Sequence, residues 1–291
     1  MAVLMQALRT AAQKELSVTL SPMATTLTRY LYGLPFVLVY LAGLICVNPD
    51  QSWCLSSLVF SNSRFLAFAS VGAIAQVVAT AFMIKVFSRK NFAIATGFAK
   101  TEAIQVALFA SIFFYDLLSP MGWLSVVVGV VGVLLISGLT WLKKQSFSWL
   151  TVFYGLMSGA LFASTSLCLR EASLSLNIAL LSSAAITLVY MVALQTFICT
   201  AYITILEKGQ WKRLIADKPR GLFVGFSSAL GSIGWFTAMT LQNAAIVKTL
   251  GQTEILLTMG ITHFYFRENI KLRELCGVFC IVASIVLVVN R

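Results

Sequence analysis

Two glutamates stand inside long apolar stretches of the chain, where an ionised side chain is costly. Glu102 lies near the start of KTEAIQVALFASIFFYD, residues 100–116, and Glu254 lies near the start of QTEILLTMGITHFYFRE, residues 252–268. In hydrocarbon such a carboxylate must pair with a cation, take up a proton or face water. Its functional interpretations are contact with a substrate ammonium group and proton carriage. Its structural interpretation is a fixed contact between two parts of the protein.

Other polar side chains within apolar stretches are candidate partners for these acids. Lys248 and Arg9 are cations, and we expect Arg9 to pair with one of the glutamates across a cavity. Gln252 follows Lys248 by one helical turn on the same side. The candidates for substrate binding or proton coupling are Glu102, Glu254, Gln105, Gln252, Lys248, Arg9, Gln76 and Trp235.

For three further residues we expect a structural role rather than a role in binding or proton coupling. We expect Lys100 to extend its ammonium group toward the membrane surface. Arg29, close to the start of its apolar stretch, is expected to anchor there. His263 is the only histidine, and we interpret it as a packed or interfacial side chain rather than a proton relay.

Cysteine and histidine usage predicts neither a metal site nor a catalytic site. Cys276 and Cys280 lie four residues apart, but no histidine or further cysteine accompanies them, so we interpret them as packing residues. No nucleophile with a base and no cluster of acids is visible in the sequence. We therefore expect no enzymatic activity, no cofactor and no metal.

The composition shows which solvent surrounds the elements that must position these residues. The chain is 59% hydrophobic and 11% charged, and its mean hydropathy is +0.90. A soluble domain needs more polar surface than this. About 20 apolar residues span a bilayer, and we predict ten helical runs, at about 1–16, 23–46, 65–88, 91–115, 120–142, 148–169, 175–206, 219–241, 244–266 and 272–290.

The chain carries a net charge of +11, which in a soluble protein favours a nucleic-acid partner. In a membrane protein, basic residues in the connections face anionic lipid head groups instead. We therefore expect no nucleic-acid partner. The expected partners are the lipid bilayer, a small-molecule substrate and protons as candidate coupling ions, and the expected assembly is a monomer or a homodimer.

The two glutamate-containing stretches belong to an internal repeat. A shift of 152 residues pairs Asn91 with Asn243 and Glu102 with Glu254, and it continues into the final helix of each half. Matching polar residues are informative because each is costly to place in a membrane. We predict two five-helix halves, residues 1–142 and 148–291, joined near 143–147.

An odd number of helices per half gives the two halves opposite orientations, and the basic residues agree. The end of the run 65–88 and the connection after it carry Lys85, Arg89 and Lys90, whereas the counterpart connection after 219–241 carries no basic residue. The connection after 91–115 carries only one charged residue, Asp116, whereas its counterpart after 244–266 and the start of the next run carry Arg267, Lys271 and Arg273. Basic charge thus changes sides between equivalent connections, which predicts an inverted repeat.

Inverted repeats are typical of secondary transporters, whose binding site lies near the bilayer midplane between the repeats. The predicted fold class is an all-α membrane protein with ten transmembrane helices as two inverted five-helix repeats. A secondary carrier explains the repeat, the charge inversion and the buried acids together. A channel or a non-transporting membrane scaffold remains the alternative, and a membrane-embedded enzyme is a weaker one.

The chain resembles the drug/metabolite transporter superfamily, and within it the EamA-like ten-helix transporters. The resemblance covers nearly the whole chain and includes the spacing of the acids. Each family half has a glutamate in its fourth helix and a second acid fourteen residues later, a spacing that Glu102 and Glu254 keep. The resemblance implies a small-metabolite carrier, often an exporter, without enzymatic activity. The chain departs from the family pattern where Ala103 and Ile255 replace prolines, Tyr115 and Arg267 replace glycines, and Asp116 replaces a glutamate.

Two lines of reasoning disagree on orientation. At least thirteen basic residues lie in the connections on one side, against Arg64, Arg170 and Arg291 on the other, which places both termini outside the cytoplasm. The family is usually described with both termini in the cytoplasm. The first run is short for a span, so a longer natural N-terminus is a further alternative. We expect the protein in a bacterial cytoplasmic (inner) membrane, where it moves a small polar or amphiphilic metabolite such as an amino acid or amine.

Overall fold

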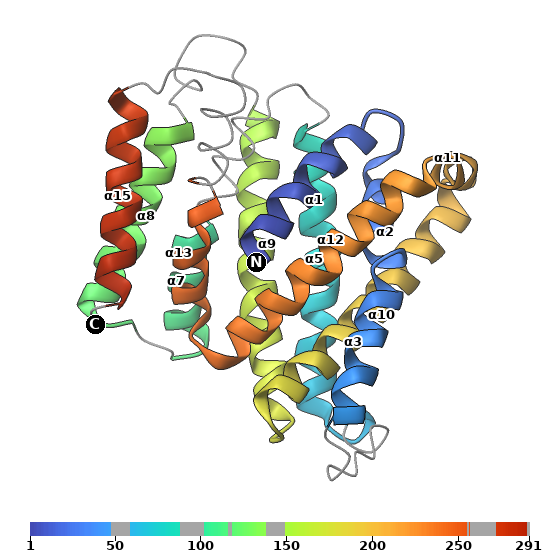
Figure 1. Ribbon diagram of the computed structural model, residues 1–291, viewed down its shortest axis with the longest axis horizontal. Coiled ribbons are helices and arrows are strands. Elements are labelled where there is room, and N and C mark those ends of the chain that lie inside the picture. The colour runs from blue at the N-terminus through green and yellow to red at the C-terminus, as the bar shows by residue number, and fades with distance from the viewer. Residues whose placement is uncertain are drawn as a thin grey trace.

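The computed structural model describes residues 1–47, 59–87, 102–115, 118–137, 149–254, 256 and 272–289. Within these residues every regular element is a helix, and no β-strand occurs (Figure 1). The helices are α1 (Ala2–Leu16), α2 (Pro22–Leu31), α3 (Leu34–Val47), α5 (Ser63–Phe87), α7 (Glu102–Phe113), α8 (Pro120–Ser137), α9 (Trp149–Ser175), α10 (Leu180–Leu206), α11 (Gln210–Ala216), α12 (Lys218–Leu241), α13 (Ala244–Gly251) and α15 (Leu272–Val289).

Four of the described segments are long and apolar enough to cross a membrane: Pro22–Val47, Ser63–Lys85, Leu180–Leu206 and Lys218–Leu241. Three more apolar helices, Glu102–Phe113, Pro120–Leu135 and Leu275–Leu287, are shorter. These segments agree with the predicted all-α membrane protein. The count of ten spans remains a prediction.

Several helix starts follow from local chemistry. The backbone N–H of Ala24 donates to Ser21 Oγ at 3.1 Å, and Pro22, which lacks an N–H, is the first residue of α2. Pro120 likewise opens α8. At α13, the backbone N–H of Ala245 donates to Asn243 Oδ1 at 2.8 Å. These caps satisfy N–H groups that have no partner within their own helices.

The predicted run 23–46 is broken into α2 and α3. The break lies at Tyr32 and Gly33, and Pro35, a residue type that interrupts helices from their interior, lies in the first turn of α3. An ideal Cβ placed on Gly225 of α12 would lie 2.7 Å from the backbone nitrogen of Gly33. Helix α12 therefore passes the junction at backbone distance, as expected for a glycine that allows close helix packing.

A methyl group at Gly225 is expected to destabilise the protein. Gly225→Ala would press a Cβ against the backbone of Tyr32 and Gly33, and overpacking of this kind costs about 1–3 kcal/mol. Gly43→Ala in α3 is the matched control, because nothing lies within 4 Å of its ideal Cβ. Thermal unfolding in detergent should show a lower midpoint for Gly225→Ala and an unchanged or higher midpoint for Gly43→Ala. Equal midpoints would contradict the close contact.

The predicted run 244–266 is also interrupted. Helix α13 ends at Gly251, and Gln252 is its C-cap, so Gln252 does not continue an unbroken helix from Lys248 as expected. An ideal Cβ on Gly251 would overlap the indole ring of Trp235. The glycine therefore admits this ring, and glycine is also a poor helix former.

The helices pack as pairs that include distant parts of the chain. Helix α5 packs along α9, α1 along α12, α10 against α2 and α3, α7 against α13, and α8 along α15. Figure 1 shows α8 and α15 side by side at one end of the molecule, and α2, α3 and α10 toward the other. This arrangement brings α1, α2, α5, α7, α9, α12 and α13 around the centre.

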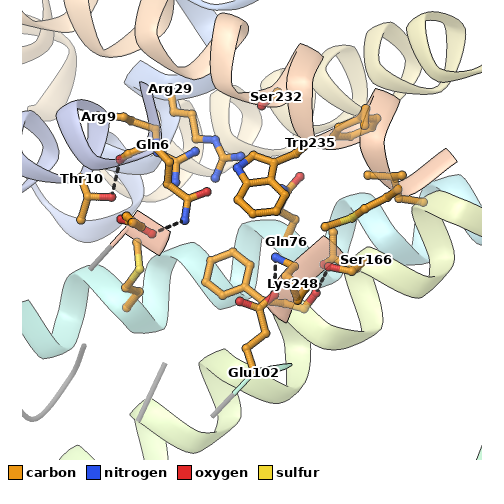
Figure 2. A pocket seen from close by; sticks show the side chains of 17 residues that line it. Gln6, Arg9, Thr10, Arg29, Gln76, Glu102, Ser166, Ser232, Trp235 and Lys248 are labelled. Carbon is orange, nitrogen blue, oxygen red and sulfur yellow. Dashed lines mark hydrogen bonds and ion pairs between the residues drawn. The ribbon is translucent and has the colours of Figure 1, made fainter. Parts of the chain in front are cut away.

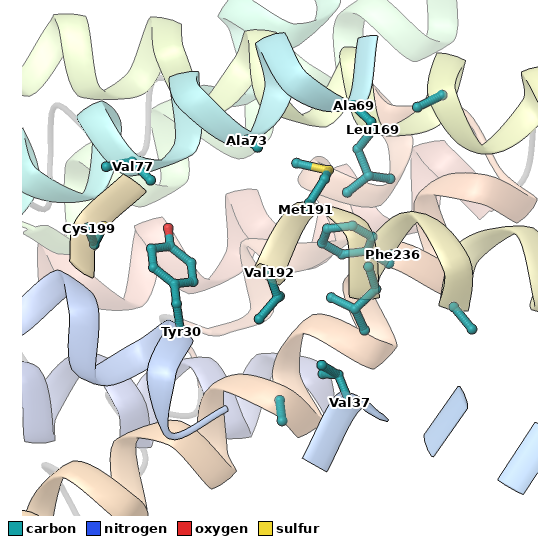
Figure 3. Packing of buried hydrophobic residues seen from close by; sticks show 14 of the residues in the cluster. Tyr30, Val37, Ala69, Ala73, Val77, Leu169, Met191, Val192, Cys199 and Phe236 are labelled. Atoms are coloured by element: carbon teal, nitrogen blue, oxygen red, sulfur yellow. The ribbon is translucent and has the colours of Figure 1, made fainter. Parts of the chain in front are cut away.

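Two apolar clusters hold this arrangement together. The larger cluster includes Tyr30, Val37, Met191, Cys199 and Phe236, from α2, α3, α10 and α12 (Figure 3). The smaller cluster is formed by side chains of α7, α8, α9 and α13 and by Leu118. Burial of such side chains excludes lipid and water and fixes the positions of the helices.

Candidate functional site

A cavity of about 120 Å³ lies between these helices (Figure 2). Its wall combines a polar side and an apolar side. The polar lining residues are Gln6, Arg9, Thr10, Arg29, Gln76, Glu102, Thr165, Ser166, Ser232, Lys248 and Glu254, and the apolar ones are Met83, Phe162, Leu169, Trp235, Phe236 and Met239. Polar groups concentrated inside a membrane bundle mark a path or site for a polar solute.

Glu102 and Lys248 form an ion pair in this cavity. Lys248 Nζ lies 2.5 Å from Glu102 Oε1, and the two side chains are only 16% and 17% exposed. The ammonium group also lies 5.0 Å from the centroid of the Trp235 ring, a cation–π contact. The pair joins α7 to α13, and Figure 2 shows it beside Trp235.

Glu254 has a different contact, although it is the repeat counterpart of Glu102. Gln6 Nε2 of α1 donates to Glu254 Oε2 at 3.1 Å. Glu254 makes at least one further interaction. The sequence repeat thus does not extend to the described contacts, which are an ammonium group at Glu102 and an amide group at Glu254.

Arg9 and Arg29 are both 6% exposed and both line the cavity. The ion pair predicted between Arg9 and a glutamate is not formed among the described residues. Gln6, three residues earlier on α1, contacts Glu254 instead. The prediction that Arg29 anchors at the membrane surface is wrong, because α2 packs against α5, α10 and α12 and directs its polar side chains inward.

The three predicted glutamines occupy different places. Gln76 lines the cavity and accepts a hydrogen bond of 2.7 Å from Gln195 Nε2 of α10. Gln252 is 3% exposed and lines a smaller neighbouring pocket with Gln6, Glu102 and Glu254. Gln105 lines neither pocket and instead contacts α9, where an ideal Cβ on Gly159 would lie 2.9 Å from its Oε1.

Six of the eight predicted residues therefore lie around the cavity: Arg9, Gln76, Glu102, Trp235, Lys248 and Glu254. Their roles in binding or proton coupling remain predictions. Lys100 and His263 lie outside the described residues. Among the described residues, no group of three or more His, Cys, Asp or Glu side chains is arranged to hold a metal ion.

Sequence reasoning missed several lining residues, above all Gln6, Ser166 and Ser232. Gln6 lies in the short first run, three residues before Arg9, so its position one helical turn from a candidate was the available signal. Serines occur throughout these helices as backbone-bonded packing residues. Ser166, for example, donates to the carbonyl of Phe162 at 2.9 Å, so serine alone gave no signal.

The arrangement suits reversible binding of a small solute. Cations, carboxylates and amides face one space, while aromatic and thioether side chains supply an apolar wall. Such a mixture of a few directed polar groups with apolar surface is typical of ligand sites.

Comparison with solved structures establishes the fold. One crystal structure aligns over 99% of this chain and 95% of its own chain, with a TM-score of 0.70 and 12% sequence identity. At this identity the likeness shows a shared fold alone. No curated protein matches the chain.

Comparison with protein families agrees with the resemblance seen in the sequence. The model of the EamA-like transporter family matches residues 149–290, which contain α9 to α15. The match of residues 149–290 to the EamA-like transporter family is consistent with the drug/metabolite transporter superfamily, and together with the apolar helices it points to an integral membrane protein.

Proposed function

We propose that this protein is a secondary transporter that moves a small polar or amphiphilic metabolite, such as an amino acid or an amine, by alternating access. The observation that carries the proposal is the central cavity, whose charged side chains come from both halves of the chain. Arg9, Arg29 and Glu102 belong to residues 1–142, and Lys248 and Glu254 belong to residues 148–291. A site between two repeats is where such carriers bind their substrates.

The pairing of helices supports two related halves. A shift of 152 residues carries Pro120–Ser137 onto Leu272–Val289, and it carries α5 largely onto α12 and α1 into α9. Under this exchange the α5–α9 contact becomes the α12–α1 contact, and both contacts occur. The α8–α15 contact maps onto itself. Carriers with such halves change access when the halves exchange conformations.

The proposed orientation of the halves, the proton carriers, the membrane and the direction of transport rest on the sequence. Basic charge that changes sides between equivalent connections favours inverted orientation. Glu102 and Glu254 are the candidate proton carriers, because buried acids in transporters serve as proton relays. The proposed setting is the cytoplasmic (inner) membrane of a bacterium, with export as the proposed direction.

Transport by the purified protein in proteoliposomes tests the proposal. Labelled amino acids and amines should enter by counterflow, which requires a saturable carrier that exchanges solute across the membrane. A protonophore should abolish uptake driven by a pH gradient while leaving counterflow intact. Uptake without trans-stimulation would indicate a channel, and no uptake of any solute would favour a scaffold.

A further inference from the structure

We propose that Arg9 and Arg29 form a carboxylate-binding subsite, so that the transported metabolite carries a free carboxylate. This inference rests on the proposed function and narrows it: amino acids and small organic acids are substrates, whereas amines without a carboxylate are not. The two guanidinium groups extend from α1 and α2 toward the same space (Figure 2).

The charges around the cavity leave a positive excess. The described lining residues include three cations, Arg9, Arg29 and Lys248, and two carboxylates, Glu102 and Glu254. Lys248 and Glu102 neutralise each other at 2.5 Å. Glu254, which has contacts of its own, is the remaining carboxylate among the described lining residues, against two arginines.

Neither arginine has a carboxylate partner among the described residues. Arg29 Nη1 donates a hydrogen bond of 3.5 Å to Thr80 Oγ1. The guanidinium carbon of Arg29 lies 5.2 Å from the ring centroid of Tyr30. Arg9 Nε is buried, and no described residue accepts a hydrogen bond from it. Each arginine is only 6% exposed. Burying two cations without an anion beside them costs free energy.

Guanidinium chemistry identifies the missing partner. Arginine presents its donors in a planar fork that matches a carboxylate or a phosphate, and it forms two parallel hydrogen bonds with either. A dianionic phosphate would add two negative charges beside Glu102 and Glu254, whereas the described lining residues carry an excess of only one positive charge. A carboxylate carries the single negative charge that fits.

The remaining wall indicates what the carboxylate is attached to. Phe162, Phe236 and Met239 line the cavity together with Trp235, and they provide apolar surface for a hydrocarbon or aromatic body. The subsite therefore fits an amphiphilic carboxylic acid with or without an amino group.

Matched compounds on one skeleton test the subsite directly. Isothermal titration of the purified full-length protein would compare each of the common L-amino acids with its amide, its decarboxylated amine and its deaminated acid. We expect at least one skeleton on which the two carboxylate-bearing compounds bind about tenfold or more tightly than the amide and the amine, because the latter leave the arginines unpaired.

Variants then place the effect at the two arginines. Arg29→Gln and Arg9→Gln should each weaken carboxylate binding about tenfold or more and leave amide binding within about twofold. Arg29→Lys should recover only part of the affinity, since lysine keeps the charge but loses the fork. Arg64→Gln is the control, because Arg64 is 65% exposed in its ion pair with Glu171. Thermal unfolding would verify that each variant is folded.

The possible results separate the subsite from the proposed function. Amides that bind as tightly as carboxylates, or carboxylate affinity that is unchanged in both glutamine variants, would overturn the subsite. The same holds if no carboxylate binds at all. Carboxylate binding without counterflow would support the subsite and remove the transport function. Counterflow of amines as fast as that of carboxylates would support transport and overturn the subsite.

Discussion

Glu102→Gln is expected to abolish most transport and to destabilise the protein, and adding Lys248→Gln should restore much of the stability. The single change leaves the Lys248 ammonium, 16% exposed in the wild type, without its counter-charge at 2.5 Å. Breaking a buried pair by removing one partner costs about 3–5 kcal/mol, and we expect about 1–3 kcal/mol here because some exposure remains. The double variant removes both charges and with them the uncompensated one.

A double-mutant cycle measured by thermal unfolding provides the check. The coupling free energy between Glu102 and Lys248 should be well above that of the exposed pair Arg64–Glu171, whose N–O distance is 2.8 Å. Exposed pairs contribute about 0–1 kcal/mol, so the second pair is a matched reference. Additive effects of the two cavity changes would contradict a stabilising ion pair.

Glu254→Gln is expected to lower transport driven by a pH gradient about tenfold or more, and to leave counterflow largely intact. Gln6 contacts Glu254 through a neutral amide, whereas Glu102 contacts an ammonium. Arg9 lies within electrostatic reach of Glu254, and Glu102 and Lys248 line the same small pocket. The ion pair with Lys248 holds Glu102 in its charged form, so of the two equivalent acids we predict that Glu254 carries the proton.

Parallel assays of uptake at several pH values and of counterflow at fixed pH would check this prediction. Glutamine cannot bind and release a proton, so the pH dependence of uptake should flatten in this variant. Glu171→Gln, which removes an acid 21% exposed in the ion pair with Arg64, is the control and should keep the wild-type profile. An unchanged profile for Glu254→Gln, with normal expression, would leave Glu254 only a structural role.

The sequence was sufficient to predict residues whose burial is costly. Glu102, Lys248 and Glu254 stand in apolar stretches, and the cost of placing a charge there is a local property of the chain. The same reasoning led to Arg9 and Gln76 at the cavity. Apolar length likewise predicted the long helices α5, α10 and α12, because the bilayer thickness determines how many residues span it.

The partners of these residues were not predictable in the same way. Gln6 contacts Glu254 across 248 positions of sequence, and no local pattern encodes such a contact. Arg29 was assigned to the surface from its distance to a helix end, but the packing of α2 between neighbouring helices decided its burial. The break at Gly33 depends on the approach of Gly225 from α12, which is again a tertiary effect.

The unequal partners of the two repeat-related acids have a consequence for the resting protein. The residue 152 positions before Lys248 is Thr96, so an exchange of the two halves offers Glu254 no equivalent ammonium. The two access states of the proposed carrier would then differ in the Glu102–Lys248 ion pair, and a difference of about 1.4 kcal/mol is a tenfold difference in population. The empty carrier would dwell mainly in one state, and the apparent KM for substrate would differ between the two faces of the membrane.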